Sequence, residues 1–114
     1  VRPSHAPDAL RIETVGWRGD HPDSLAILLG AAPGSRETEL WRWSLAPGER
    51  YGSEYGSETW HEILYVLAGT LTVALPDAEH VMAAGDFRIF SSRDPYTFAN
   101  QGEASVQFLR AVVL

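Results

Sequence analysis

Turn-forming residues interrupt this chain so often that no long element fits into it. Glycine, proline, asparagine and aspartate recur roughly every eight to twelve residues, between short apolar runs. No window shows the sustained spacing of an amphipathic helix. Many short strands with regularly spaced turns are typical of an all-β sandwich or barrel. The short connections favour antiparallel pairing, because a parallel neighbour needs a longer crossover.

We expect about nine strands within a single domain. They are expected at residues 11–17, 24–29, 38–45, 61–68, 70–75, 80–86, 87–92, 96–100 and 104–114. Gly69 and Thr70 are expected to form a tight hairpin turn, and Gly85 with Asp86 a further corner. Residues 1–9 contain two prolines and no periodicity, so we expect an arm or linker there and one domain over residues 10–114.

The composition excludes several classes of protein. The chain has 114 residues, a net charge of −6 and no cysteine, so disulfides and thiolate metal sites are excluded. Its nine basic residues are all arginine and are dispersed, so it lacks the basic patch that binds nucleic acid or an anionic membrane. No apolar run approaches the roughly 20 residues of a membrane-spanning helix.

Three segments carry a more specific pattern: residues 46–50 (APGER), 61–73 (HEILYVLAGTLTV) and 84–100 (AGDFRIFSSRDPYTFAN). Together they resemble the cupin family of double-stranded β-helix, or jelly-roll, barrels with antiparallel strands. Glu62, six residues and Gly69 resemble the end of the first cupin motif, which Gly48 fits at its start. Gly85 opens the second motif, and Tyr96-x-x-x-Asn100 lies where the family has His-x-x-x-Asn. The resemblance covers roughly residues 37–110.

Within that family the chain most resembles the cupin domain that follows a helix-turn-helix in XRE-type bacterial transcriptional regulators. The shared features are the PG turn, a VLxGxLTV-like segment, the AGD corner and the ending NQGEAS at residues 100–105. The resemblance implies a small-molecule-sensing domain of a cytoplasmic regulator, whose DNA-binding part would lie upstream of Val1. From the dispersed arginines and the lack of a long apolar run, we expect no direct contact of this domain with nucleic acid, and no membrane.

The family's metal is held by two motif-one histidines, the motif-one glutamate and the motif-two histidine. In this chain the two motif-one histidine positions fall on Glu54 and Gly56 in one register of the alignment, and on Tyr55 and Ser57 in the other. The motif-two histidine position falls on Tyr96. Only Glu62 remains of the four ligands, so we expect no metal and no cofactor. A carboxylate site for a hard cation, built from Glu54, Glu58 and Glu62, stays open.

Glu62 is expected to face the barrel interior, and its neighbour His61 therefore the outside. A buried carboxylate needs a hydrogen-bond partner, and the phenol of Tyr96 can offer one across the barrel. Two interpretations stay open. Either the two side chains only satisfy each other, or they are the polar points of a ligand pocket.

Aromatic residues are expected around this acid. Trp41 and Trp43 alternate with polar residues and should point inward, and Phe98 shares a face with Tyr96. These rings fit either core packing or a ligand site. An acid among aromatic faces favours a ligand that carries an amine or a hydroxyl group. The candidate ligand-binding residues are Glu62, Tyr96, Trp41, Trp43, Phe98 and Tyr55.

No catalytic residue stands out, and two other functions compete with the regulator. One is a metal-dependent cupin enzyme, such as a dioxygenase, isomerase or epimerase. The other is a stand-alone ligand-binding barrel. We also expect a homodimer, because cupins commonly pair through their sheets and residues 24–29 would form an apolar edge strand that needs covering.

Overall fold

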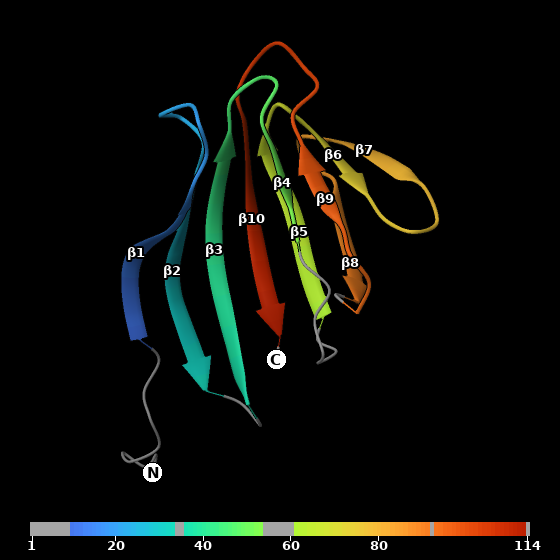
Figure 1. Cartoon of the computed structure of the whole chain (residues 1–114). Helices are drawn as coiled ribbons and strands as arrows, with labels where there is room; N and C mark the ends of the chain where they lie inside the picture. Colours follow the sequence, from blue (N-terminus) through green and yellow to red (C-terminus); the bar gives the residue numbers. More distant parts are fainter. Residues whose placement is uncertain (1–9, 34–35, 54–60, 92, 114) are drawn as a thin grey trace.

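Ten antiparallel strands make up the described part of the chain in a computed structural model, which describes residues 10–33, 36–53, 61–91 and 93–113 (Figure 1). The strands are β1 (Leu10–Arg18), β2 (Leu25–Pro33), β3 (Glu37–Leu45), β4 (Arg50–Gly52), β5 (His61–Ala68), β6 (Thr70–Ala74), β7 (Glu79–Ala83), β8 (Phe87–Ser91), β9 (Thr97–Ala99) and β10 (Val106–Val113). The predicted all-β class is confirmed. The expected arm at residues 1–9 lies outside the described residues.

The strands form two sheets. The larger has the order β1-β2-β3-β10-β5-β8, and the smaller has the order β4-β9-β6-β7. In Figure 1, β1 and β2 lie at one side of the molecule and the β6–β7 pair at the other. Strand β10 lies inside the large sheet, where it pairs with both β3 and β5.

All nine expected strands are present, and the structure adds one more. The strand that the sequence analysis missed is β4, which pairs with β9 through only three residues of a polar stretch. Such a short strand carries no detectable alternation of its own. Its pairing depends on a partner more than forty residues away, Phe98 opposite Tyr51.

The expected hairpin at Gly69 is wrong. Strand β5 pairs with β10 and β8 in the large sheet, whereas β6 pairs with β7 and β9 in the small one. Gly69, with φ of 81°, is therefore a corner at which the chain passes from one sheet to the other. Gly85, with φ of 92°, makes the reverse passage between β7 and β8, as the expected corner required.

The expectation that residues 24–29 form an edge strand is also wrong. Strand β2 lies between β1 and β3 and pairs with both. The edges of the large sheet are β1 and β8. Apolar residues alone could not distinguish an edge strand from an inner one, because the position of β2 is set by its pairing with β1 and β3.

The core lies between the two sheets and is strongly aromatic. Alternate residues of β3, β5, β6 and β10 point into it, as period-two patterning predicts. Trp43 has ring contacts with four other aromatic residues, among them Phe108, whose stacked ring lies 5.7 Å away between centroids. Phe98 packs at right angles to both of these rings. This core fixes the inner faces on which the candidate site is built.

Candidate functional site

A carboxylate, a guanidinium and a phenol form one buried cluster between the sheets. Glu62 of β5 is 0% exposed, Tyr96 before β9 is 5% exposed and Arg110 of β10 is 9% exposed. Arg110 donates from Nε to Glu62 Oε1 at 2.7 Å and from Nη2 to Glu62 Oε2 at 3.1 Å. The Tyr96 hydroxyl donates to Glu62 Oε2 at 2.6 Å and accepts from Arg110 Nη2 at 2.9 Å. The two-pronged contact is the strongest geometry available to an arginine and a carboxylate.

The environment keeps both donors of this cluster protonated. Burial is the main cause that raises the pKa of Tyr96 well above its ordinary value, and the negative charge of Glu62 adds to it, while the Arg110 charge opposes it. For Arg110, burial by itself lowers the pKa, but the hydrogen bonds and charge of Glu62 outweigh it, so the pKa is raised overall. Tyr96 is therefore a hydrogen-bond donor and Arg110 a cation under all ordinary conditions.

The expected pairing of Glu62 with Tyr96 across the barrel is confirmed, and so is the outward position of His61. The structure adds Arg110, whose charge compensates that of Glu62. An acid that already has a cationic partner offers little attraction to an amine. This removes the basis on which the sequence favoured a cationic ligand.

The aromatic candidates are brought together around the cluster. Trp43 and Phe98 are fully buried, and the Tyr96 ring stacks on Phe98 with 5.0 Å between centroids. Trp41 is half-buried, and its ring lies so close to Gly16 of β1 that a Cβ there would come within 2.5 Å. The Arg110 guanidinium lies 5.9 Å from the ring centroids of both Trp41 and Trp43. Tyr55, the remaining candidate, lies outside the described residues.

Sequence reasoning missed Arg110 and Tyr51. The signal for Arg110 was present, since it sits in β10 on the same alternation as Val106, Phe108 and Val112, which all point inward. A charge on a core-facing position indicates a buried partner. Tyr51 gave no such signal, because it lies on the three-residue β4. Its ring contacts Trp43 at 4.9 Å, and its hydroxyl influences the pKa of both Tyr96 and Arg110.

The last residue of the second motif has a structural role. Asn100 is buried, donates to the carbonyls of Leu45 and Ala104 at 2.9 and 2.8 Å, and accepts from the Gly102 amide at 2.9 Å. It therefore closes the loop between β9 and β10. Its hydrogen bonds are satisfied by the backbone, which leaves it outside the candidate site.

The described residues do not fit the metal site that the cupin fold implies. Glu62 is engaged by Arg110, and a protonated phenol stands at the motif-two histidine position. Within the described ranges no three His, Asp or Glu side chains are grouped as metal ligands. Glu54 and Glu58, and both registers of the motif-one histidine positions, lie outside these ranges. Neither register contains a histidine.

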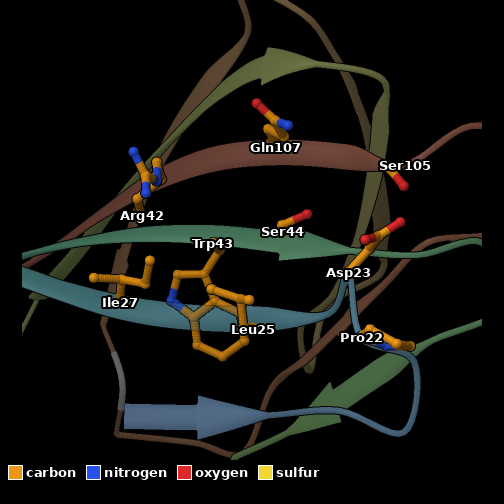
Figure 2. Close-up of a pocket in the computed structure, with 9 residues that line it drawn as sticks. All are labelled: Pro22, Asp23, Leu25, Ile27, Arg42, Trp43, Ser44, Ser105 and Gln107. Atoms are coloured by element: carbon orange, nitrogen blue, oxygen red, sulfur yellow. The ribbon is translucent and has the colours of Figure 1, made fainter. Parts of the chain in front are cut away.

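A separate cavity lies on the outer face of the large sheet. It has a volume of about 540 Å³ and lies against β2, β3 and β10, with Ser44 and Gln107 in its lining. Figure 2 shows the indole ring of Trp43 extending away from the side chains of these two residues. The outer cavity is therefore on the opposite face of the sheet from the buried cluster. In the described part of the chain no helix is long and apolar enough to cross a membrane.

Several solved structures are similar to this chain. One is the Cupin_2 domain of an XRE family transcriptional regulator from Enterobacter cloacae, with a TM-score of 0.65 and 18% identity over 68% of this chain and 81% of that one. Another is an HTH_3 family transcriptional regulator from Vibrio cholerae, with a TM-score of 0.67 and 20% identity over 85% of this chain. The match spans 56% of the Vibrio chain.

A third similar structure comes from Thermotoga maritima and is described as a predicted oxalate decarboxylase. It has a TM-score of 0.62 and 20% identity, and the match covers 100% of this chain and 98% of that one. Identities this low show a common fold. No curated protein matches the chain in sequence.

The cupin domain family gives the decisive match. Its model aligns with residues 41–112, a span that contains both cupin-like motifs, the Glu62–Arg110–Tyr96 cluster and nearly all of the aromatic core. The matched residues form the two-sheet β fold that is expected of a cupin domain. The chain therefore belongs to the cupin family.

Proposed function

We propose that this domain senses a small molecule as part of a bacterial helix-turn-helix transcriptional regulator, and that it acts in the cytoplasm. The DNA-binding part would lie upstream of Val1. The observation that carries the proposal is that the buried Glu62 carboxylate is bound by protein side chains. Glu62, which matches a metal ligand of the family, is held by Arg110 and Tyr96 and lies among buried aromatic side chains, which supports an organic ligand over a metal ion. The similar regulator structures support the same function.

The first test of the proposal is the gene itself. We expect the reading frame upstream of Val1 to encode a helix-turn-helix pattern, and a purified protein that includes it to bind its own promoter. Effector binding at this domain should change that DNA affinity. A reading frame that begins at this domain would contradict the regulator function and favour the stand-alone barrel.

The isolated domain is not expected to bind DNA. Its net charge is −6, and arginines of the described strands lie apart, with Arg42 on β3, Arg50 on β4 and Arg88 on β8. Such a chain cannot neutralise a row of phosphates. A gel shift of duplex DNA by this domain alone, weakened by added salt, would contradict the expectation.

A metal-dependent enzyme is the competing function, and the similarity to the Thermotoga protein over the whole chain favours it. Elemental analysis of protein purified without a metal-affinity resin separates the two. The sensor proposal expects no stoichiometric zinc, iron, nickel or manganese. One equivalent of such a metal, lost in a Glu62→Ala variant that still folds, would favour the enzyme.

A further inference from the structure

Two buried nitrogen atoms in the described part of the barrel have no hydrogen-bond partner. They are Nε of Arg88 and Nε1 of Trp43. A buried N–H group without an acceptor costs free energy, so each such group calls for an explanation. Both are donors only, and neither can serve as an acceptor.

Arg88 points into the barrel from β8. Its neighbours Phe87 and Ile89 are exposed, whereas Phe90, on the same face as Arg88, packs its ring against Tyr96 with 5.2 Å between centroids. The alternation of the strand therefore places Arg88 on the inner face. Arg88 as a whole is half-buried, and its Nε is the atom that is fully covered.

Arg88 and Arg110 belong to one row of the large sheet. Arg110 of β10 pairs with Leu64 of β5, and Leu64 pairs with Arg88 of β8. Two strand spacings, roughly 10 Å, separate the two backbones. Trp41 continues the same row on β3, opposite Arg110. The inner face thus carries two cations in line, separated by an apolar side chain and flanked by a ring.

Trp43 lies one inward position further along β3 and is only 2% exposed. In Figure 2 its ring nitrogen lies on the side of Arg42 along the strand, which is the direction of the row that contains Trp41 and Arg110. Its unpartnered N–H is therefore directed within the barrel toward the level of the arginines.

Two carboxylates on the same inner face are already engaged. Glu62 accepts from Arg110 and Tyr96, and Glu39 accepts from Nε1 of Trp41 at 3.0 Å. The contacts of Arg110 with this cluster use Nε and Nη2, so Nη1 takes part in none of them. Two donors of the described interior are therefore left without an acceptor, and an anion or a carbonyl oxygen would satisfy them.

We propose that the barrel binds a small apolar carboxylate, whose carboxylate group is held by Arg88 with Nη1 of Arg110 and whose body lies against the aromatic rings. Trp43 Nε1 supplies a further donor to an oxygen of the ligand. This inference deepens the sensor function and rests on it. An amine is disfavoured because Arg110 compensates Glu62. A phosphate is disfavoured because Arg110 is already paired with Glu62 and an aromatic interior solvates a dianion poorly.

The test uses the purified domain and two sets of probes of similar shape. Benzoate, phenylacetate and hexanoate are the carboxylates, and benzylamine and benzyl alcohol are the controls. Tryptophan fluorescence and calorimetry report binding, since Trp17, Trp41 and Trp43 all pack in or against the core. We expect at least one carboxylate to bind about tenfold or more tightly than the amine and the alcohol.

The key variant is Arg88→Met, which keeps an unbranched apolar stem of similar reach to the arginine methylenes and removes the guanidinium with its unpartnered Nε donor. Carboxylate affinity should fall by about tenfold or more, while thermal stability stays the same or rises because no buried N–H is left unsatisfied. If Arg88 had only a structural role, its loss would not weaken carboxylate binding while leaving thermal stability unchanged. Arg42→Gln, at an exposed position on β3, is the control and should change neither.

Each failure has a distinct meaning. Unchanged carboxylate affinity in Arg88→Met, or preferential binding of benzylamine, would overturn the carboxylate inference and leave ligand sensing in place. Binding of the carboxylate without any change in promoter affinity of the longer protein would overturn the sensor function and leave the site in place. If none of the probes binds and ordered water occupies the donors in a crystal structure, the carboxylate inference is overturned, and the promoter experiment alone then decides the sensor function.

Discussion

At the scale of single residues, the Glu62–Arg110–Tyr96 cluster decides what the interior can do. Burying two charges costs several kcal/mol per ion, and the attraction between them repays this only when the remaining hydrogen bonds are also satisfied. Here Tyr96 donates to the carboxylate and accepts from the guanidinium, so it bridges both partners. The three side chains therefore form one energetic unit, and removing any one of them exposes the other two to an unfavourable environment.

Glu62→Gln is expected to lower the free energy of unfolding by about 3–5 kcal/mol, because it leaves the Arg110 charge buried without a counter-charge. Urea denaturation measures the change. Glu103→Gln, at an exposed position, is the control and should stay within about 0.5 kcal/mol of wild type.

A double variant sharpens that experiment. Glu62→Leu combined with Arg110→Met removes both charges and should recover most of the lost stability, since apolar replacement of a buried pair is often neutral. If Glu62→Gln alone costs less than about 1 kcal/mol, the pair is not the buried unit that the hydrogen bonds indicate.

The raised pKa of Tyr96 predicts a pH dependence. Its pKa is higher in the folded than in the unfolded protein, where it is near 10.0. The folded state then binds the extra proton, so the stabilisation is complete below pH 10 and is lost as the pH rises further. Unfolding free energy should fall above about pH 10 in wild type and fall less steeply in Tyr96→Phe.

Absorbance of phenolate near 295 nm checks the same group directly. Folded wild type and Tyr96→Phe should show the same phenolate signal near pH 10.5, and one extra phenolate should appear in wild type only when the protein unfolds. An additional phenolate in folded wild type near pH 10 would show that Tyr96 is accessible to hydroxide and that the cluster is open.

At the scale of elements, two glycine corners carry the chain between the sheets. Both have positive φ, but their surroundings differ. A Cβ on Gly69 would lie 2.7 Å from the Ser105 carbonyl oxygen and 2.9 Å from Val106 Cα, whereas a Cβ on Gly85 meets nothing within 4 Å. The β5–β6 corner therefore needs glycine both for its positive φ and for the close approach of the backbone at Ser105 and Val106. The β7–β8 corner needs it only for its positive φ.

The two corners form a matched pair of variants. Gly85→Ala should cost about 1–2 kcal/mol of unfolding free energy, the strain of a left-handed backbone at a residue with a Cβ. Gly69→Ala should cost clearly more, because backbone atoms of the loop before β10 must also move. Chemical denaturation of both variants compares them, and equal costs would show that the close approach to Ser105 and Val106 is relaxed in solution.

At the scale of the whole molecule, the outer face of the β10–β5–β8 region remains apolar and exposed. Phe87 is 65% exposed, Ile89 is 58% exposed and Tyr65 is 44% exposed. Tyr65 pairs with Phe87 across the strands, and Ile63 pairs with Ile89, so these side chains are adjacent on one face. A contiguous apolar patch on a small domain marks an interaction surface.

A second copy of the chain is the occupant that we propose for this patch, as the expected homodimer requires. The four paired residues carry no charge, so two identical patches related by a two-fold axis can face each other without repulsion. Light scattering should give about twice the chain mass of 12.6 kDa. Phe87→Glu should give the monomer, because it places a charge in the interface.

The control for the dimer is Val81→Glu. Val81 is 68% exposed, but it lies on β7 of the other sheet. This variant should keep the dimer mass. A mass near that of one chain at all concentrations in wild type would contradict the dimer and leave the patch without an occupant.

The sequence by itself determined the properties that depend on neighbouring residues. Period-two alternation predicted the inward position of Trp43 and placed His61 on the face opposite to Glu62, because successive side chains of a strand point to opposite faces. The two cupin-like motifs predicted the contact between Glu62 and Tyr96. These signals are local or are carried by a family pattern, so they could be read without coordinates.

Only the tertiary structure decided which strands meet. The hairpin expected at Gly69 was wrong because a turn residue specifies a change of direction and does not specify which sheet receives the next strand. The partner of Glu62 is Arg110, 48 residues further along the chain, and the row that joins Arg110 to Arg88 exists only because β5 lies between β10 and β8. Pairing over such separations is set by the packing of the whole core, and no local pattern encodes it.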